Sequence, residues 1–445
     1  MARKVFISFL GTNNYLQTHY DFGNGQISEP VRFVQEALIS SICKNWTEND
    51  RIYIFCTKDA LRINWKDNGH ARFNEKEKRD QEIEKIGLKH RLEKNFKLHQ
   101  IVEQVDIDEG FSEKEIWNIF DCVYNKLQPK DEIYFDVTHA FRSIPLFSTV
   151  LFNYSRFMKD TNVVSINYGA FEKLGPAYKV KEFPISERIA PVIDLTNIAR
   201  LQQYTDMASS MVTFGRIKHI SKTLKTENYS ASPIIEQLSE SIEDFDNSLL
   251  ANRMNQIKSG KSIIAIKNNI KALRKLDIPN PIKKVIGRLD SEIKDFVAED
   301  SNKNIEAAIE WSVKYKMLPQ AYTLGQEYII SLLCEKMKDR NPFTDKKKTE
   351  NRKNFRMYLS SLCSISEDDI KNEKIREPLS LHLKLTKELL EDETIQNLRP
   401  VYSELGEKRN AVNHAKGSVT YEELEKEFYS LYHKCLSLIN PIPCS

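Results

Sequence analysis

Residues 131–143 read DEIYFDVTHAFRS. The first seven form an apolar-rich run that predicts a buried strand, and the other six form a loop rich in hydrogen-bonding groups. An apolar segment at 144–158 follows directly and predicts a helix. A strand, a polar loop and a helix in this order are typical of the repeating unit of a doubly wound α/β fold.

The sequence around this unit repeats the alternation. Ser112 with Glu115 three residues later is a capping-box pattern and predicts the start of another helix. Residues 66–97 are highly charged and are expected to form an exposed helical insertion. The other predicted strands are 4–10, 51–56, 98–105, 162–168 and, at an edge, 177–183. Residues 1–185 are therefore expected to form a Rossmann-like α/β domain with a mostly parallel sheet.

The rest of the chain has no such alternation. In residues 186–305 apolar residues recur at three and four positions, which is the helix period and predicts an all-α connector. Residues 306–445 show the same period in several amphipathic segments and predict an all-α bundle.

Composition limits the possible classes of protein. The chain has 445 residues, a net charge of +3 and 40% hydrophobic residues, which is enough for buried cores and argues against disorder. The seven cysteines are scattered and form no CxxC motif, so reduced thiols and a cytoplasmic location are expected. No segment has the roughly 18 continuous apolar residues of a membrane span, so no membrane association is expected.

Two of the predicted loops follow strands of a parallel sheet and therefore lie at the same edge of that sheet. Ligands of parallel sheets bind beyond the carboxyl ends of the strands, so this edge is the expected ligand site. Backbone amides, hydroxyl groups and the guanidinium of Arg142 suit phosphate oxygens there, and Tyr15 and Phe141 suit stacking on bases. The alternative is that these residues only shape the turn and cap the following helix. The candidate ligand-binding residues are Gly11, Thr12, Asn13, Asn14, Asp136, Thr138, His139, Ala140, Phe141, Arg142 and Ser143.

A second segment, EKRNAVNH at 407–414, lies on a predicted helix. Asn410 and His414 are four residues apart and share a face, with Arg409 beside them. Arginine would stabilise the charge that develops on a phosphate, histidine would exchange a proton with a ribose oxygen, and asparagine would orient one of these groups. No ligand cluster suggests a catalytic metal. A solvated helix end is the alternative reading.

With these residues the chain resembles the CRISPR-associated ribonucleases that join an N-terminal CARF sensor to a C-terminal HEPN nuclease. Residues 409–414, RNAVNH, fit the R-x(4–6)-H motif of HEPN domains. FLGTNNY at 9–15 and DVTHAFRSIP at 136–145 occupy the places of the two CARF loops. Relatives often have glycine where Ala140 stands, and this departure bears on ligand preference.

The resemblance implies an ancillary effector of type III CRISPR systems that works as a homodimer, with assembly beyond a dimer left open. Cyclic oligoadenylate, most often the tetra-adenylate, would bind the sensor and activate the nuclease. Arg409, Asn410 and His414 would cleave single-stranded RNA without a metal cofactor, giving 2′,3′-cyclic phosphate and 5′-hydroxyl ends. Lys408 and Lys416 would help to hold the RNA.

Three alternatives stay open at this point. The chain could be a non-catalytic sensor whose bundle binds a protein or nucleic acid. It could be a HEPN toxin whose N-terminal domain binds another ligand, which Ala140 keeps possible. It could be a nucleotide-cofactor enzyme, although neither GxxxxGK[ST] nor GxGxxG is present.

Overall fold

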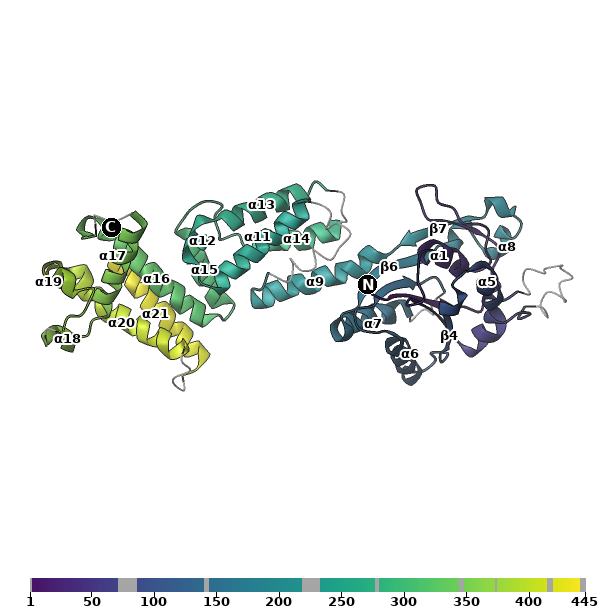
Figure 1. The fold of residues 1–445 in the computed structure, drawn as a ribbon, viewed down its shortest axis with the longest axis horizontal. Helices are drawn as coiled ribbons and strands as arrows, with labels where there is room; N and C mark the ends of the chain where they lie inside the picture. The colour runs from purple at the N-terminus through teal and green to yellow at the C-terminus, as the bar shows by residue number, and fades with distance from the viewer. Residues whose placement is uncertain are drawn as a thin grey trace. The chain divides into compact units, whose positions relative to one another are not determined.

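A computed structural model of the chain describes residues 2–70, 86–139, 144–217, 233–276, 280–343, 348–372, 374–413 and 419–440. The chain forms two compact units, Met1–Arg200 and Leu201–Ser445. The first is an α/β unit and the second is entirely helical over its described residues (Figure 1). The predicted fold class is confirmed.

The α/β unit contains a seven-stranded sheet with the order β2-β7-β6-β5-β1-β3-β4. All neighbouring strands are parallel except β6 and β7, which are antiparallel. The strands are β1 (Lys4–Leu10), β2 (His19–Asp21), β3 (Arg51–Cys56), β4 (Val102–Asp106), β5 (Glu132–Asp136), β6 (Asn162–Gly169) and β7 (Ile189–Asp194).

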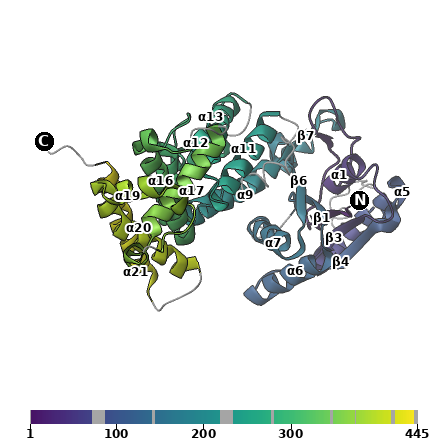
Figure 2. The same cartoon turned by 60° about the vertical axis from the view of Figure 1, so that its left-hand side comes forward.

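Helices cover both faces of this sheet (Figure 2). The central strand β1 shows why, because its side chains alternate between two cores. Phe6 and Leu10 pack with α1 and α5, whereas Ile7 and Phe9 pack with α6 and α7. The helices of this unit are α1 (Val34–Ile42), α2 (Lys58–Ala60), α5 (Leu88–Asn95), α6 (Glu113–Lys126), α7 (Ile144–Lys159) and α8 (Ala177–Val180).

Two details of the strand prediction need correction. Residues 177–183 are not an edge strand, since α8 starts at Ala177. The edge is formed instead by β2 and β7, neither of which was predicted. Because β7 is hydrogen-bonded into the sheet and lies beyond residue 185, the compact unit extends to Arg200.

The helical unit is held by one continuous core that runs from Tyr204 to Ile439. The division into a connector and a C-terminal bundle at residues 305 and 306 stays a prediction. Its helices are α9 (Thr196–Phe214, which begins in the first unit), α11 (Pro233–Leu250), α12 (Met254–Ser259), α13 (Lys261–Leu273), α14 (Asn280–Glu292), α15 (Lys303–Lys314), α16 (Leu318–Lys336), α17 (Lys348–Ser364), α18 (Glu367–Lys371), α19 (Leu383–Leu390), α20 (Glu393–Asn413) and α21 (Tyr421–Ile439). In the described part of the chain, no helix has the length and apolar character to cross a membrane.

Candidate functional site: a pocket at the sheet edge and a motif on α20

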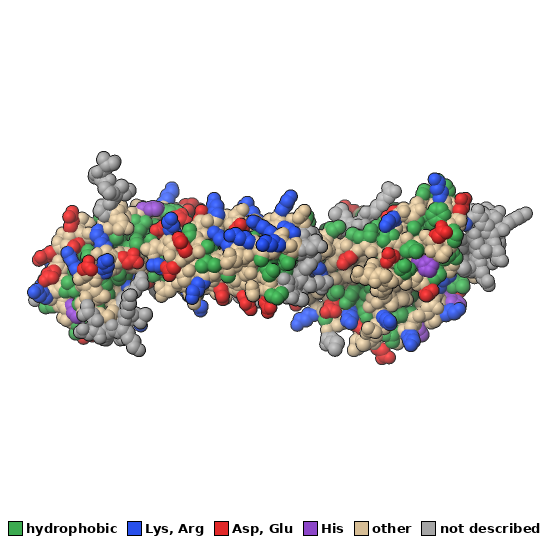
Figure 3. Space-filling view, turned by 90° about the horizontal axis from the view of Figure 1, so that it is seen from above, with side chains coloured by type: hydrophobic (Ala, Val, Ile, Leu, Met, Phe, Trp, Pro, Cys, Tyr) green, Lys and Arg blue, Asp and Glu red, His purple; other side chains and the backbone are tan. Residues whose placement is uncertain are grey.

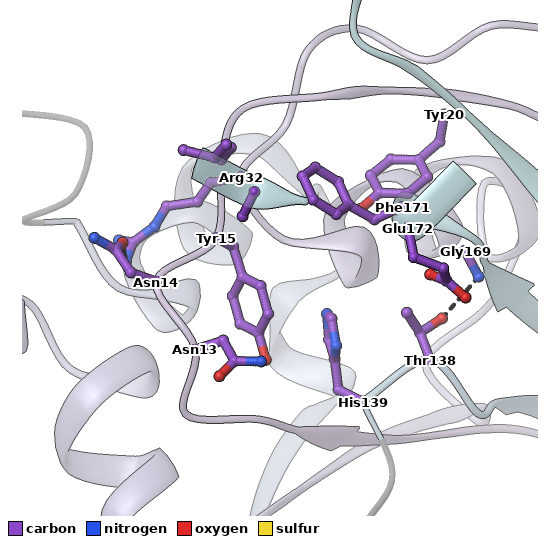
Figure 4. Close-up of a pocket in the computed structure, with 12 residues that line it drawn as sticks. Asn13, Asn14, Tyr15, Tyr20, Arg32, Thr138, His139, Gly169, Phe171 and Glu172 are labelled. Carbon is purple, nitrogen blue, oxygen red and sulfur yellow. Dashed lines mark hydrogen bonds between the residues drawn. The ribbon is translucent and has the colours of Figure 1, made fainter. Parts of the chain in front are cut away.

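A pocket of about 500 Å³ opens where β1, β5 and β6 end (Figure 4). This is the edge at which the sequence predicted a ligand site. Tyr15 and His139 stand side by side in its middle, and Arg32 and Asn14 lie at one end (Figure 4). The described lining residues are Asn13, Asn14, Tyr15, Leu16, Tyr20, Arg32, Thr138, His139, Gly169, Phe171, Glu172 and Ala177.

Asn64 holds the loop after β1 in place through two hydrogen bonds. This side chain is fully buried, and its Nδ2 donates to the carbonyl oxygens of Gly11 at 2.8 Å and Asn13 at 2.9 Å. Asn64 comes from a π-helical turn, Leu61–Trp65, some fifty residues away in the chain. Because two backbone acceptors depend on one buried amide, the loop conformation is set before any ligand arrives.

Arg32 places a positive charge in the pocket wall. The residue is only 2% exposed, and its guanidinium donates to Asn14 Oδ1 at 3.3 Å, to Asn64 Oδ1 at 3.4 Å and to the Ile86 carbonyl at 3.1 Å. It is the cation among the described lining residues, and Glu172 is the carboxylate. A guanidinium in a pocket wall is well suited to bind an anionic group such as a phosphate.

The loop after β5 is held by a buried carboxylate. Asp136 accepts from Ser8 Oγ at 2.7 Å and from the Thr138 backbone amide at 3.0 Å, and Ser8 in turn accepts from Gln35 at 3.1 Å. Thr138 Oγ1 accepts from the Gly169 amide at 2.8 Å, which ties this loop to the end of β6. Burial raises the pKa of Asp136, and the hydrogen bonds from Thr138 and Ser8 oppose that rise.

An aromatic pair forms the middle of the pocket. The rings of Tyr15 and His139 are stacked with centroids 4.2 Å apart, and Phe33 packs edge-on against Tyr15 at 5.9 Å. Gly11 lies so close that a Cβ there would be 2.1 Å from the Tyr15 hydroxyl oxygen. Burial lowers the pKa of His139 to about 4, so this imidazole is neutral at neutral pH and adds hydrogen-bonding capacity rather than charge.

The structure brings together only part of the predicted ligand set. Asn13, Asn14, Thr138 and His139 line the pocket. Gly11 and Asp136 support it from behind, and Thr12 is exposed outside it. The remaining predicted residues, Ala140, Phe141, Arg142 and Ser143, lie outside the described residues.

Sequence reasoning missed one wall of this pocket. The end of β6 supplies Gly169, and the loop after it supplies Phe171 and Glu172. The strand at 162–168 was predicted, so the rule that led to the loops after β1 and β5 applied equally to this third parallel strand. Arg32 gave no comparable signal, because only the folded chain shows that it is buried beside the loop after β1.

The second candidate site lies on α20. Tyr402 and Leu405 belong to the buried stripe of this helix, and Arg409 follows one turn later on the same side, partly exposed. The Arg409 guanidinium donates to Asn410 Oδ1, with Nη2 at 2.8 Å. The described helix ends at Asn413, and the predicted catalytic His414 and the basic Lys416 lie outside the described residues.

The surroundings of α20 qualify two of the sequence-based expectations. Lys408, expected to help hold RNA, donates to Glu427 of α21 at 2.8 Å. The R-x(4–6)-H spacing also occurs at Arg376 and His382. His382, however, lies in a short 3-10 segment, and its ring centroid is 4.9 Å from that of Phe343. Spacing alone therefore does not distinguish the two matches. Over the described residues, no group of three or more His, Cys, Asp or Glu could hold a metal ion.

Comparison with known proteins finds a relative that is similar over about half of the chain. A CRISPR-associated protein of Methanocaldococcus jannaschii is 28% identical over 232 residues, which cover 51% of this chain and 33% of that protein. The match thus spans about a third of the relative. No protein-family profile matches the chain. Csm6 of Enterococcus italicus, solved bound to cyclic hexa-2′-fluoro-hexa-dAMP, covers 99% of the chain and 94% of its own length at 12% identity, with a TM-score of 0.46.

Proposed function

We propose that this chain is a CRISPR-associated endoribonuclease that cyclic oligoadenylate activates. It cleaves single-stranded RNA in the cytoplasm without a metal, leaving 2′,3′-cyclic phosphate and 5′-hydroxyl ends. The observation that carries the proposal is the chemistry of the pocket at the sheet edge. A stacked aromatic pair and a buried guanidinium within one cavity match the two parts of a nucleotide, its base and its phosphate. The similarity to a CRISPR-associated protein supports the choice of ligand.

The size of the pocket bears on how such a ring would bind. About 500 Å³ lies within the range that encloses a drug-sized molecule, which suits one nucleotide better than a ring of four. A cyclic tetra-adenylate would therefore extend beyond one chain. A homodimer that presents two such pockets to a two-fold symmetric ring satisfies this requirement.

The α/β unit offers an apolar surface for such pairing. Four side chains on the outer side of α7 are exposed, namely Val150 at 56%, Tyr154 at 42%, Phe157 at 86% and Met158 at 52%. They recur at the spacing of one helix face. Contiguous exposed apolar surface of this kind is typical of protein–protein contacts. We assign it to the homodimer interface.

In the nuclease site, Arg409 holds the phosphate and stabilises the charge that grows on its oxygens. Asn410 keeps the guanidinium oriented through the hydrogen bond between them. His414 takes the proton from the ribose 2′-hydroxyl or gives one to the leaving 5′-oxygen. The bond between phosphorus and the 5′-oxygen of the RNA breaks, and a bond between phosphorus and the ribose 2′-oxygen forms in the cyclic product.

A cleavage assay in EDTA tests the whole proposal. A fluorescent single-stranded RNA is incubated with the full chain, with and without cyclic tetra-adenylate or hexa-adenylate. Wild type is compared with Arg409→Ala/His414→Ala and with Arg376→Ala/His382→Ala, which carries the other match to the same spacing. Activator-dependent cleavage that only the first variant loses is the expected result.

The other outcomes each remove one part of the proposal. Cleavage that ignores the activator would contradict the role assigned to the pocket. Binding of a cyclic oligoadenylate without any cleavage would contradict the nuclease and leave a non-catalytic sensor. Cleavage that survives in Arg409→Ala/His414→Ala would mean that α20 does not hold the active site.

A further inference from the structure

One segment of the helical unit has a charge unlike that of the rest of the chain. Residues 253–288 contain ten Lys or Arg and one acidic residue, Asp277, which gives a net charge of +9 against +3 for the whole protein. The neighbouring helix α11 has the opposite character, with five acidic residues and no basic ones. Figure 3 shows Lys and Arg side chains gathered over the part of the helical unit where α13 lies.

Most of these cations form no ion pair with a carboxylate in the part of the chain that the structure describes, the exceptions being Lys258, Arg274 and Arg288. Lys261, Lys271, Lys275 and Lys284 are exposed, and their ammonium groups have no partner among the described residues. We call these four residues of α13, its C-terminal turn and α14 the basic face. Lys283 Nζ donates to the Arg274 carbonyl at 3.2 Å, and Arg274 pairs with Asp290 at 3.3 Å, so the two helices bring their cations together.

The arrangement is electrostatically unfavourable for the isolated chain. Lys271 lies in the last turn of α13 and Lys275 just beyond it, so two like charges lie close together. Lys261 is the first residue of α13, and Lys284 follows the first turn of α14, close to helix ends where the dipole disfavours cations. Neither first turn contains a carboxylate. By contrast, α6 and α21 begin with glutamates. A bound polyanion would offset all of these repulsions at once.

We infer that the basic face on α13 and α14 is a docking surface for the phosphate backbone of a single-stranded nucleic acid. The proposed function names RNA as that strand, and the inference rests on it for this choice only. Residues with exposed large hydrophobic side chains are absent from the described residues 233–343, so the apolar anchors of a membrane-binding helix are missing. With lysines and no aromatic rings, the surface binds phosphates rather than bases.

The salt dependence of RNA binding tests this inference. The probe is a 2′-O-methylated single-stranded RNA, which lacks the attacking hydroxyl and stays intact on the wild-type full chain. Its dissociation constant is measured over a series of salt concentrations without any cyclic oligoadenylate. The test variant replaces Lys261, Lys271, Lys275 and Lys284 by Gln, which keeps the helix propensity of lysine. The control replaces four other exposed lysines, Lys371, Lys384, Lys387 and Lys434, by Gln.

Each phosphate contact contributes about 0.7 to the slope of log K against log salt for single strands. We expect the test variant to lose about 3 from this slope and at least tenfold in affinity at low salt, whereas the control keeps both. An unchanged slope in the test variant, or an equal loss in the control, would overturn the inference. Binding of the basic face to anionic phosphatidylserine vesicles instead of RNA would overturn it too. Because no cleavage or activator is needed, this outcome is independent of whether the chain proves to be a nuclease.

Discussion

The pocket and the α20 motif are built in different ways. Four stretches of the chain line the pocket, namely residues 13–20, Arg32, residues 138–139 and residues 169–177. Its supporting groups Ser8, Gln35, Asn64 and Asp136 are fully buried. The α20 motif comes from six consecutive residues, 409–414, of which 409–413 lie on α20. The contact described within it is the hydrogen bond between Arg409 and Asn410.

This difference indicates how each site reaches its working geometry. Buried hydrogen bonds between distant segments preorganise the pocket, so a ligand meets groups that are already oriented. A partly exposed arginine at the end of one helix lacks such an enclosure. Under the proposed function the chain is a homodimer, and binding of the cyclic oligoadenylate shifts the two copies towards the arrangement that cleaves RNA.

The largest effect is expected for Arg409, whose loss should reduce RNA cleavage while leaving the stability of the fold almost unchanged. Arg409→Ala removes a group that holds the developing charge, so RNA cleavage should fall by about 10²-fold or more. Its side chain is partly exposed, so the free energy of unfolding should change by no more than about 0.5 kcal/mol. Activated cleavage rates and urea unfolding measure the two quantities. A variant that loses stability and activity together would break the contrast between the sites.

The pocket should respond in the opposite way, through stability first. Ser8→Ala removes the hydroxyl that donates to the buried Asp136 carboxylate and accepts from Gln35. Loss of a buried hydrogen bond to a charged group is expected to lower the free energy of unfolding by about 2 kcal/mol. Urea unfolding checks this, with Ser437→Ala on the exposed side of α21 as the control. Equal effects in the two variants would show that the hydrogen bond from Ser8 to Asp136 does not stabilise the fold.

A steric change sharpens the comparison inside the pocket. Gly11→Ala places a Cβ 2.1 Å from the Tyr15 hydroxyl oxygen, so the Tyr15 ring that stacks on His139 must shift. Binding of cyclic oligoadenylate should weaken by about tenfold, which is about 1.4 kcal/mol. The next atom of Tyr15 is 3.5 Å away, so Gly11→Ala/Tyr15→Phe should recover most of the affinity. Calorimetric titration measures both, and failure of the rescue would refute the stacked pair as the ligand platform.

A further effect is expected in the pH dependence of the α/β unit. Burial lowers the pKa of His139 and of His70 to about 4 from an ordinary value of 6.5, and the Arg32 charge adds to the effect on His70. The unfolded chain therefore binds more protons between pH 6.5 and 4, and stability should fall as the pH is lowered through that window. Denaturation midpoints measured across it should fall less steeply for His139→Gln. An identical slope in wild type and variant would place His139 in a solvated setting.

Local sequence patterns predicted a large part of the fold. The capping pattern of Ser112 and Glu115 gave the start of α6, since Ser112 Oγ accepts from the Glu115 amide as expected. The α/β alternation and the helical second half are confirmed, because both depend on periodicities within a few residues of each other. The same locality explains the failure at 177–183, where short apolar runs fit a strand or a helix equally well.

For the candidate sites, the sequence by itself determined which loops meet at the sheet edge and where Arg409, Asn410 and His414 lie along the chain. Only the tertiary structure decided that Arg32 and Glu172 join the pocket, that Asp136 lies beneath it and that Lys408 pairs with Glu427. The physical reason is range. Strand and helix preferences act between near neighbours, whereas burial and charge pairing join segments that only the folded chain brings into contact.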